Sequence, residues 1–399
     1  MTQLTELPPA ARAVDSCDPP VHDGPFLRVL HVINGEHYAG AEKVQDLLAL
    51  RLPQRGVQVS FACLRPARFA SQRVSQVPLY DVPMKSRVDL RPAWRLRRLI
   101  KQQGYHLVHT HTPRSALVGH LAARWAGLPM VHHVHGQTVS ELTRRKFGQF
   151  SAAVERRSLR HAAALIAVSG SLRRHLIGQG YADDQISVVP NGVPGPPILI
   201  PRDPPRHLWT VATVALFRPR KGTEILLESM ARLRADGLPV RLRAIGRFET
   251  AAYEAEVRRR AAALGLAPHI TWTGFTSDVP GALSDCDVMV LPSLLAEGLP
   301  MVVVEAMAAG VPAVGTRVDG ITDVLQHEQN GLLAEPGSPD DLAHQLARLI
   351  RGEVDWRRLR QAGFASHQHA YSDHSMADGV AGTYRKVLRQ SPQPATVRS

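Results

Sequence analysis

Short apolar runs recur along this chain, and each ends in polar or glycine residues before a helical stretch begins. This alternation constrains the fold more than any other feature, because strands that alternate with helices form a parallel sheet with helices on both faces. One series of runs precedes residue 193 and another follows residue 207. The expected strands are 26–35, 105–112, 129–136, 163–170 and 186–192, then 208–216, 239–246, 270–274, 287–293, 312–316 and 331–336.

A proline-rich segment, PGPPILIPRDPPR at 194–206, separates the two series and predicts an interdomain linker. We therefore expect an α/β protein with two doubly wound domains, at 25–193 and 207–370. A C-terminal helix at 371–390 is expected to cross back to the first domain. Residues 1–24 are rich in proline and small residues, which predicts a disordered tail. Ligands of such sheets bind at the carboxyl ends of the strands, so the site is expected between the domains.

The charge of the chain favours anionic partners. It has 48 Lys and Arg against 35 Asp and Glu, a net charge of +13. Nucleic acid is not an expected partner, because no recognition module or series of stacking aromatic residues accompanies the charge. Basic clusters at 91–101, 143–146 and 155–160 suggest an anionic membrane surface, with solvated helix faces as the alternative.

Three cysteines without metal-ligand spacing indicate a reducing compartment. The N-terminus lacks the pattern of a signal peptide, and no apolar run reaches the length of a membrane span. We expect a cytoplasmic protein that is at most peripheral on the inner face of the cell membrane.

The segment AEGLPMVVVEAMAAGVP, 296–312, is almost wholly apolar, yet it holds Glu297 and Glu305. Pro300 suits the first turn of a helix, which is expected over 301–309. A buried carboxylate needs a polar partner, and no cation lies nearby in sequence. The partner is therefore a remote arginine or a ligand rich in hydroxyl groups, and both remain open at this point.

Two turns are candidate phosphate-binding sites, one that contains glycine and one that contains basic residues. Gly40 lies in NGEHYAGAEKVQ between a strand and a helix, where backbone N–H groups can meet a phosphate, although a plain tight turn is the alternative. Arg218, Arg220 and Lys221 lie in the first loop of the second domain. They could hold a diphosphate or form a solvated basic loop.

Two motifs resemble metal sites. HHVHG places His133 and His135 on one face of a strand, but no third ligand has suitable spacing, so a single histidine facing the site is favoured. The D-x-D pattern at 285–287 lies at the entrance of its strand rather than at the carboxyl end. We expect neither a metal nor another cofactor.

Taken in order, these segments resemble the family 4 retaining glycosyltransferases, which have the GT-B fold. The most specific part is the pair Glu297 and Glu305, which matches the family's E-x7-E block. The other matching segments are AGAE, VHHVHG, IAVSGSLRR, VVPNGV, RKG and GLLAEPGSPDDLA, and together they cover about 26–389.

The resemblance implies roles for these residues. Glu297, His135 and Lys221 are the expected catalytic side chains: the glutamate meets hydroxyls of the donor sugar, the histidine lies near that sugar, and the lysine binds the diphosphate. Glu305 is expected to bind the nucleotide ribose, and Gly40 to approach the phosphates. Backbone N–H groups at the helix start are expected to meet donor oxygens. That start comprises Gly298, Leu299, Pro300 and Met301.

Two positions depart from the family pattern. Leu216 stands where an arginine is usual, and Phe248 stands where a second glycine is common. Because side chains two residues apart in an extended segment share a face, we expect Arg218 to replace the missing arginine. Arg220 is expected to point into solvent.

The expected reaction moves a sugar from a nucleotide diphospho-sugar, UDP- or GDP-linked, to a saccharide or lipid-linked acceptor, with retention at the anomeric carbon. The expected setting is polysaccharide or glycoconjugate biosynthesis. One alternative is a nucleotide-sugar epimerase or hydrolase on the same fold. Another is an inactive membrane-associated scaffold, which the departure at Leu216 favours.

Overall fold

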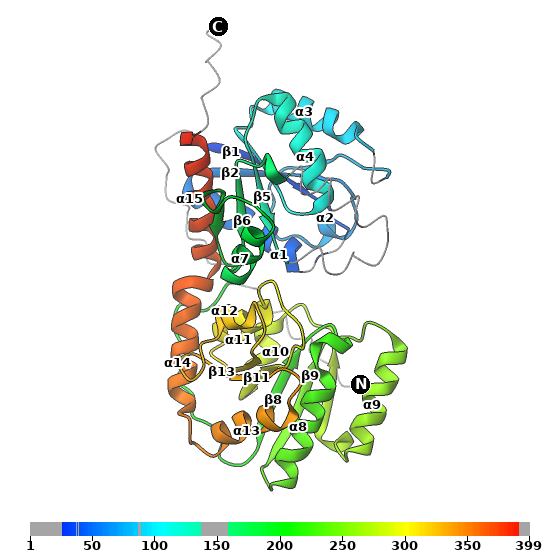
Figure 1. The fold of residues 1–399 in the computed structure, drawn as a ribbon, viewed down its shortest axis with the longest axis vertical. Coiled ribbons are helices and arrows are strands. Elements are labelled where there is room, and N and C mark those ends of the chain that lie inside the picture. Colours follow the sequence, from blue (N-terminus) through cyan, green and yellow to red (C-terminus); the bar gives the residue numbers. More distant parts are fainter. Residues whose placement is uncertain (1–25, 37, 39, 87–88, 137–158, 391–399) are drawn as a thin grey trace, which may run out of the picture.

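The fold consists of two parallel sheets, one in each half of the chain, with helices packed around them (Figure 1). This confirms the expected class of two doubly wound units. The 1–24 segment lies outside the residues that the structure describes. This computed structural model describes residues 26–36, 38, 40–86, 89–136 and 159–390.

The first sheet has seven strands in the order β3-β2-β1-β4-β5-β6-β7. Its strands are β1 (Leu27–Ile33), β2 (Val57–Cys63), β3 (Leu79–Asp81), β4 (Leu107–Thr110), β5 (Met130–Val134), β6 (Ala164–Ala167) and β7 (Ile186–Val188). Its described helices are α1 (Gly40–Arg51), α2 (Arg68–Gln72), α3 (Arg91–Gln103), α4 (Pro113–Ala126) and α7 (Gly170–Gly178), with short 3₁₀ turns at Leu52–Arg55 and Asp183–Gln185.

The second sheet has six strands in the order β10-β9-β8-β11-β12-β13. Its strands are β8 (Trp209–Val214), β9 (Val240–Ile245), β10 (Ile270–Gly274), β11 (Val288–Leu291), β12 (Ala313–Thr316) and β13 (Leu332–Ala334). Its helices are α8 (Thr223–Ala235), α9 (Ala251–Ala263), α10 (Val279–Leu283), α11 (Met301–Ala308), α12 (Ile321–Val324) and α13 (Pro339–Ile350), with 3₁₀ turns η3 (Pro219–Lys221) and η4 (Ala267–His269).

Alternation along the central strand β1 builds a core on each face of the first sheet. Leu30 and Val32 belong to the core that also contains residues of α3 and α4. Val29 and Ile33 belong to another core, which contains residues of α1. Because successive strand residues point to opposite faces, a strand buried on both sides reads as a continuous apolar run.

Local sequence explains the ends of α4. The Thr112 side chain accepts a hydrogen bond from the backbone N–H of Ser115, and Pro113 occupies the first turn, where its missing N–H costs nothing. Gly127 follows the helix with a φ of 73°, a left-handed conformation that favours glycine. These residues begin and end the helix that connects β4 to β5 along the chain.

The C-terminal helices connect the two sheets (Figure 1). Residues 194–206 contain no helix or strand. Beyond α13, the chain continues through α14 (Trp356–Ser366), a π-helical turn (His367–Tyr371) and α15 (Asp373–Gln390). The Trp356 indole donates to the backbone oxygen of Asp287 in the second unit, at 2.7 Å. Tyr384 of α15 is fully buried in the core of the first sheet, with Val29 and Val44. One continuous C-terminal segment thus contacts both units.

Direct contacts also join the two units. Asp323 of α12 accepts a hydrogen bond from the backbone N–H of Ser171 in α7, at 3.1 Å. A Cβ atom added at Gly298 would lie only 2.1 Å from the backbone oxygen of His135. The loop before α11 therefore lies directly against the loop after β5, and only glycine fits this approach.

Candidate functional site

A basic turn and a glutamate meet beyond the carboxyl ends of β8 and β11. Lys221 ends the turn η3, and Glu297 lies in the loop between β11 and α11. The Lys221 ammonium donates to Glu297 Oε1 at 2.6 Å, and the Ser293 hydroxyl donates to the same oxygen at 2.7 Å. Arg220 Nη1 lies 3.9 Å from that oxygen. Remote segments thus supply the cations that the local sequence around Glu297 lacks.

This ion pair is largely shielded from water. The side chains of Lys221 and Glu297 are 16% and 10% exposed. Burial lowers the pKa of Lys221, and the charge of Glu297 opposes that effect. Since charge interactions strengthen as water is excluded, this lysine is placed to interact strongly with an anionic ligand.

The structure corrects our expectation for Arg220. We expected it to point into solvent, but its side chain is only 25% exposed and lies near Glu297, so that expectation was wrong. The physical reason is that residues 219–221 form a 3₁₀ turn, and this turn brings Arg220 as well as Lys221 toward Glu297. Arg218 instead pairs with Glu249, at 3.5 Å between Nη1 and Oε1. The Nε atoms of both arginines are buried without a hydrogen-bond partner.

Glu305 lies inside α11 in a different environment. Burial raises its pKa to about 7, and only the charge of Lys43 in α1 opposes the shift. This carboxyl group therefore changes its protonation state near neutral pH. Lys43 belongs to the first unit, so both halves of the chain determine the charge of Glu305.

The loop before α11 is held in a tight conformation. Gly320 has a φ of 86°, and an added Cβ would lie 2.3 Å from the backbone oxygen of Glu297. Leu299 is buried, and α11 begins at Met301 after Pro300. Proline has no N–H group, so Pro300 cannot donate to a ligand as the expected helix-start site would require.

Gly40 begins α1 with a φ of 22°, and no heavy atom of the described residues lies within 4 Å of the position that its Cβ would take. The residue is exposed. Open space beside the first turn of α1 is compatible with the expected approach of a phosphate to its backbone. The neighbouring positions 37 and 39 lie outside the described residues.

His135 follows β5 and is neutral. Burial lowers its pKa to about 4. Its Nε2 lies 3.3 Å from Nδ1 of His111, whereas its Nδ1 is buried without a hydrogen-bond partner. His132 has another role, since its Nδ1 lies 2.7 Å from the Thr110 hydroxyl on the neighbouring strand. A neutral imidazole can exchange a hydrogen bond with a hydroxyl, but this Nδ1 is buried, so contact with a substrate requires a local rearrangement.

Asp287 of the D-x-D pattern has a structural role. Asp287 Oδ2 accepts a hydrogen bond from the backbone N–H of Thr210 at 2.7 Å, and Arg202 pairs with the other carboxylate oxygen. The residue is 3% exposed and directly precedes β11. Its oxygens therefore fix the start of a strand.

The departure at Phe248 also has a structural explanation. Its ring centroid lies 5.0 Å from that of Phe217 and 5.3 Å from that of Trp272. An aromatic cluster thus stabilises the loop after β9, where the resemblance leads one to expect a glycine turn. Leu216, at the position of the missing arginine, is 42% exposed.

Sequence reasoning missed three contributors to the site. Ser293 lies two residues beyond β11 and donates to Glu297, the charge of Lys43 acts on Glu305, and Asp323 accepts from α7. Ser293 could have been noticed as a polar residue at the end of an apolar run. Nothing in the sequence indicates the other two, because their partners are distant along the chain.

Comparisons with known proteins agree with this geometry. Residues 38–194 match a family described as Glycosyltransferase Family 4, and residues 208–352 match one described as Glycosyl transferases group 1. A phosphatidyl-myo-inositol mannosyltransferase of Mycobacterium leprae is 30% identical over 301 residues, which are 73% of this chain and 76% of that protein. The UDP-Gal:alpha-D-GlcNAc-diphosphoundecaprenol alpha-1,3-galactosyltransferase of Escherichia coli is 24% identical and matches 82% of this chain and 89% of its own length.

Among solved structures, HepE from Anabaena in complex with UDP superposes with a TM-score of 0.77. The alignment covers 90% of this chain and 100% of HepE, at 20% identity. At this identity the likeness concerns the fold, and the same two-sheet architecture is present in both proteins.

Proposed function

This chain belongs to glycosyltransferase family 4 and has the GT-B fold, and we propose that it transfers a sugar from a nucleotide diphospho-sugar to a saccharide or lipid-linked acceptor, with retention at the anomeric carbon. The observation that carries the proposal is the shielded contact of Lys221 with Glu297, beside Arg220. The next residue, Gly298, touches the backbone of His135 in the other unit. Donor-binding and sugar-binding groups are therefore adjacent.

A bound donor diphosphate would replace Glu297 as the ionic partner of Lys221. In the free protein Glu297 accepts from Lys221. A bound diphosphate carries more negative charge than the Glu297 carboxylate. It can therefore interact with the Lys221 ammonium and with the guanidinium groups of Arg218 and Arg220. The glutamate is then available to hydroxyls of the donor sugar. As the glycosidic bond breaks, the same cations stabilise the charge that builds up on the leaving diphosphate.

The remaining site residues bind the parts of the donor on either side of the diphosphate, the ribose and the sugar. Glu305 accepts hydrogen bonds from the ribose hydroxyls, and its charged form is the better acceptor. Backbone N–H groups of Gly298, Leu299 and Met301 and of Gly40 meet donor oxygens. His135, which is neutral, contacts a hydroxyl of the transferred sugar. In this scheme the acceptor hydroxyl attacks on the face from which the diphosphate leaves and passes its proton to an oxygen of that diphosphate, so no protein nucleophile is needed.

A UDP-sugar is the donor that we propose first, with a GDP-sugar as the alternative. HepE has been solved with UDP and with UDP-glucose. The name of the E. coli relative specifies UDP-galactose and a diphosphoundecaprenol-linked acceptor. These proteins support the donor class and the acceptor class proposed here, polysaccharide or glycoconjugate precursors.

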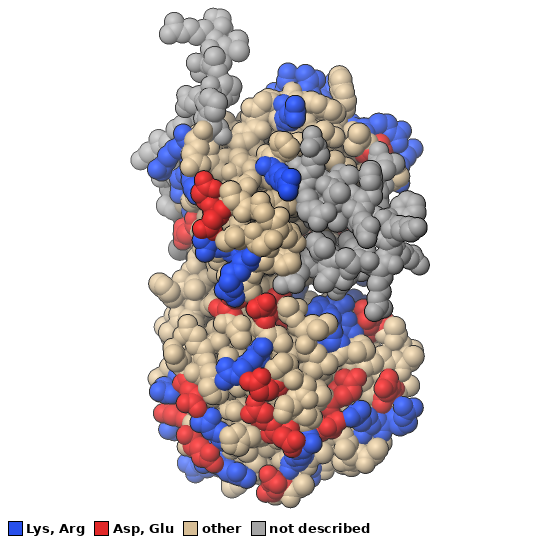
Figure 2. Space-filling view, in the orientation of Figure 1, with Lys and Arg blue, Asp and Glu red and all other residues tan. Residues whose placement is uncertain are grey.

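We also propose that α3 contacts an anionic membrane. The helix buries Leu96 and Ile100 but exposes Arg95, Arg98 and Trp94, the last at 64%. Figure 2 shows Lys and Arg side chains at the top of the molecule, where Figure 1 places α3. Among the described residues, no helix is long and apolar enough to span a bilayer. The cluster at 143–146 and most of 155–160 lie outside the described residues.

A donor screen followed by product analysis tests the proposal. UDP- and GDP-sugars are first ranked by their effect on the melting temperature, which a ligand of the folded state raises. The selected donor is then incubated with polyprenyl-diphosphate-linked and free saccharide acceptors, and the product is examined by NMR. We expect an acceptor that has gained a sugar with the donor's anomeric configuration. Free sugar or an epimerised donor without such a product would instead support the hydrolase or epimerase.

A further inference from the structure

Five histidines gather at the carboxyl end of the first sheet. His31 lies in β1, His109 lies in β4 with His111 just beyond it, and His133 lies in β5 with His135 just beyond it. His31 pairs with His109 across the two parallel strands. Residues two apart in a strand share a face, so all five side chains point to the same side of the sheet.

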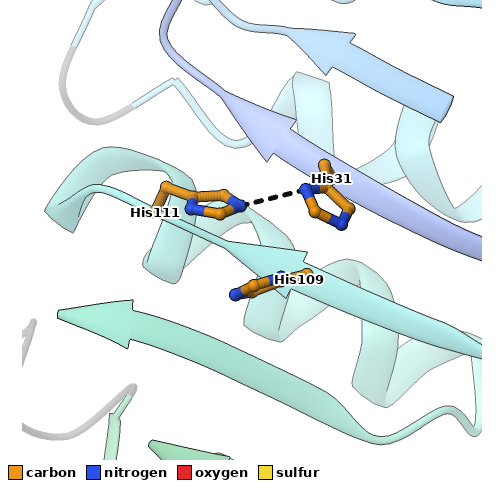
Figure 3. Close-up of side chains that lie close together, drawn as sticks. All are labelled: His31, His109 and His111. Carbon is orange, nitrogen blue, oxygen red and sulfur yellow. Dashed lines mark hydrogen bonds between the residues drawn. The ribbon is translucent and has the colours of Figure 1, made fainter. Parts of the chain in front are cut away.

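Hydrogen bonds arrange three of these rings around a common point. The Tyr384 hydroxyl lies 3.0 Å from Nε2 of His31 and 2.6 Å from Nδ1 of His109. Nε2 of His111 lies 3.1 Å from Nδ1 of His31, as Figure 3 shows. Nε2 of His109 is buried and has no hydrogen-bond partner among the residues that the structure describes. An unpartnered polar atom in a fully buried ring calls for a ligand that can satisfy it.

We propose that His31, His109 and His111 form a site for one divalent transition-metal ion, with Zn²⁺ as its occupant. One nitrogen from each residue lies within 4.8 Å of the others. Zinc binds imidazole nitrogen at about 2.0–2.1 Å in tetrahedral geometry, which separates two ligand nitrogens by about 3.3–3.4 Å. The 3.1 Å between His31 and His111 is close to that separation.

The ligand chemistry selects the class of ion. Three imidazoles without a carboxylate suit zinc, copper or nickel, whereas magnesium and calcium require oxygen ligands. His31, His109 and His111 are all buried, and an imidazole binds a metal in its neutral form through a ring nitrogen. A water molecule would complete the four ligands of the zinc.

Tyr384 is the residue that orients this site. A histidine that binds a metal usually donates its other N–H to an oxygen, which fixes the ring and its tautomer. The Tyr384 hydroxyl lies within hydrogen-bond distance of both His31 and His109. It belongs to α15, so a bound ion would link the C-terminal helix to β1 and β4. Binding is therefore expected to stabilise the attachment of α15.

A competing set, His111, His133 and His135, also brings its nitrogens within 4.8 Å of one another. It shares His111 with the proposed set, so the two sets cannot be filled together. The proposed set is favoured because each of its rings has its other nitrogen held. By contrast, both nitrogens of His133 and Nδ1 of His135 have no hydrogen-bond partner within the described part of the chain. Sequence spacing shows only two members of each set, because the third ligand comes from another strand.

The test uses the full chain without a polyhistidine tag, dialysed first against EDTA. ZnCl₂ is titrated calorimetrically, and Co²⁺ serves as an absorbance probe of coordination geometry. We expect one ion per chain, a tetrahedral Co²⁺ spectrum that Zn²⁺ abolishes, and a higher melting temperature with Zn²⁺. The matched variants are His109→Gln and His133→Gln, because both histidines are fully buried on neighbouring strands. The first should abolish the binding and the second should preserve it.

Tyr384→Phe keeps the ring and removes the hydroxyl. It should weaken Zn²⁺ binding about 10-fold or more, as loss of such orienting partners does, without changing the stoichiometry. If His109→Gln fails to fold by circular dichroism, this variant decides, and unchanged Zn²⁺ affinity would overturn the assignment. Absence of saturable binding to the wild type would overturn it as well. So would binding that survives His109→Gln, or binding that is lost in His133→Gln.

Discussion

Glu297 and Glu305 belong to one short apolar segment, yet they have different environments at the residue scale. Glu297 is paired with Lys221 and Ser293, so its charge is balanced in the free protein. Glu305 is desolvated by burial, which raises its pKa to about 7. The first residue is therefore suited to a role in turnover, and the second to a proton-linked role in donor binding.

Donor affinity should depend on pH through Glu305. Its folded pKa is raised, so the group is protonated below about pH 7, whereas ribose hydroxyls favour the charged acceptor. Binding should release a proton, and the dissociation constant for the UDP-sugar should rise by up to about 10-fold per pH unit below 7. Calorimetry at several pH values and in two buffers of different ionisation enthalpy measures both effects.

The control for this prediction is Glu305→Gln, which cannot ionise. Its donor affinity should be weaker above pH 7 and should lack the pH slope. The raised pKa also means that the charged form destabilises the free protein, a cost that grows as pH rises from the unfolded value toward 7. Glu305→Gln should therefore raise the melting temperature at pH 8 without donor. Identical slopes in wild type and variant would contradict the assignment.

Arg220→Ala should lower kcat/KM about 10-fold or more, roughly 1.4 kcal/mol. The reason is its position 3.9 Å from Glu297, on the lysine side of the turn. Arg218→Ala is expected to cost a similar amount, because this residue is the stand-in that the sequence suggests for the arginine missing at Leu216. Steady-state kinetics with the selected donor give both values. If kcat/KM is unchanged in Arg220→Ala but falls strongly in Arg218→Ala, the expectation from the sequence is correct: Arg218 binds the diphosphate and Arg220 does not.

At the scale of elements, the apolar pattern predicted eleven of the described strands. It missed β2 and β3. In β2, VQVSFAC, polar residues interrupt the apolar run, and pairing with β1 determines the strand. The three residues of β3 lie at the sheet edge and are too few to show a period. Long-range pairing therefore supplied what local periodicity could not.

The side-chain partners were less predictable than the strands. The E-x7-E block and the basic turn could be located from the sequence, but Lys43 and Ser293 could not be assigned as neighbours of the two glutamates. The expected direction of the Arg220 side chain was wrong, because residues 219–221 form a 3₁₀ turn that brings this side chain toward Glu297. Contacts between segments far apart in sequence depend on how the two units pack.

The exposed face of α3 should bind anionic vesicles. Sedimentation with phosphatidylglycerol vesicles should be strong at low salt and weak at high salt, since exposed charges more than about 10 Å apart are screened at 0.1 M. The double change of Arg95 and Arg98 to Gln should reduce it. The matched control changes Arg258 and Arg259 of α9, in the other unit, to Gln. Binding that ignores salt and lipid charge, or equal loss in the control, would argue against α3.

At the scale of the whole molecule, the two sheets approach each other through the loops that hold Glu297 and His135. Since cationic side chains are placed to meet the diphosphate, sugar transfer should survive EDTA at full rate. The prediction concerns the diphosphate, whose cations lie outside the histidine site; the rate is therefore also measured after dialysis with ZnCl₂ added back, because the proposed zinc ligand His111 lies 3.3 Å from His135. Activity lost to EDTA and restored by Mn²⁺ would mean that a metal ion, and not the basic turn, holds the diphosphate.

The central claim is that Lys221 stabilises the diphosphate while sugar is transferred, and Lys221→Met tests it most directly. The change preserves most of the side-chain length and removes the charge. Its kcat/KM for transfer should fall about 100-fold or more, in the range seen when one preorganised charge-stabilising donor is removed. Lys386→Met is the control, because that lysine is exposed on α15 and donates to the backbone oxygen of Asp184, far from the basic turn in sequence. Transfer by Lys221→Met within about threefold of the control, with both proteins folded, would contradict the account.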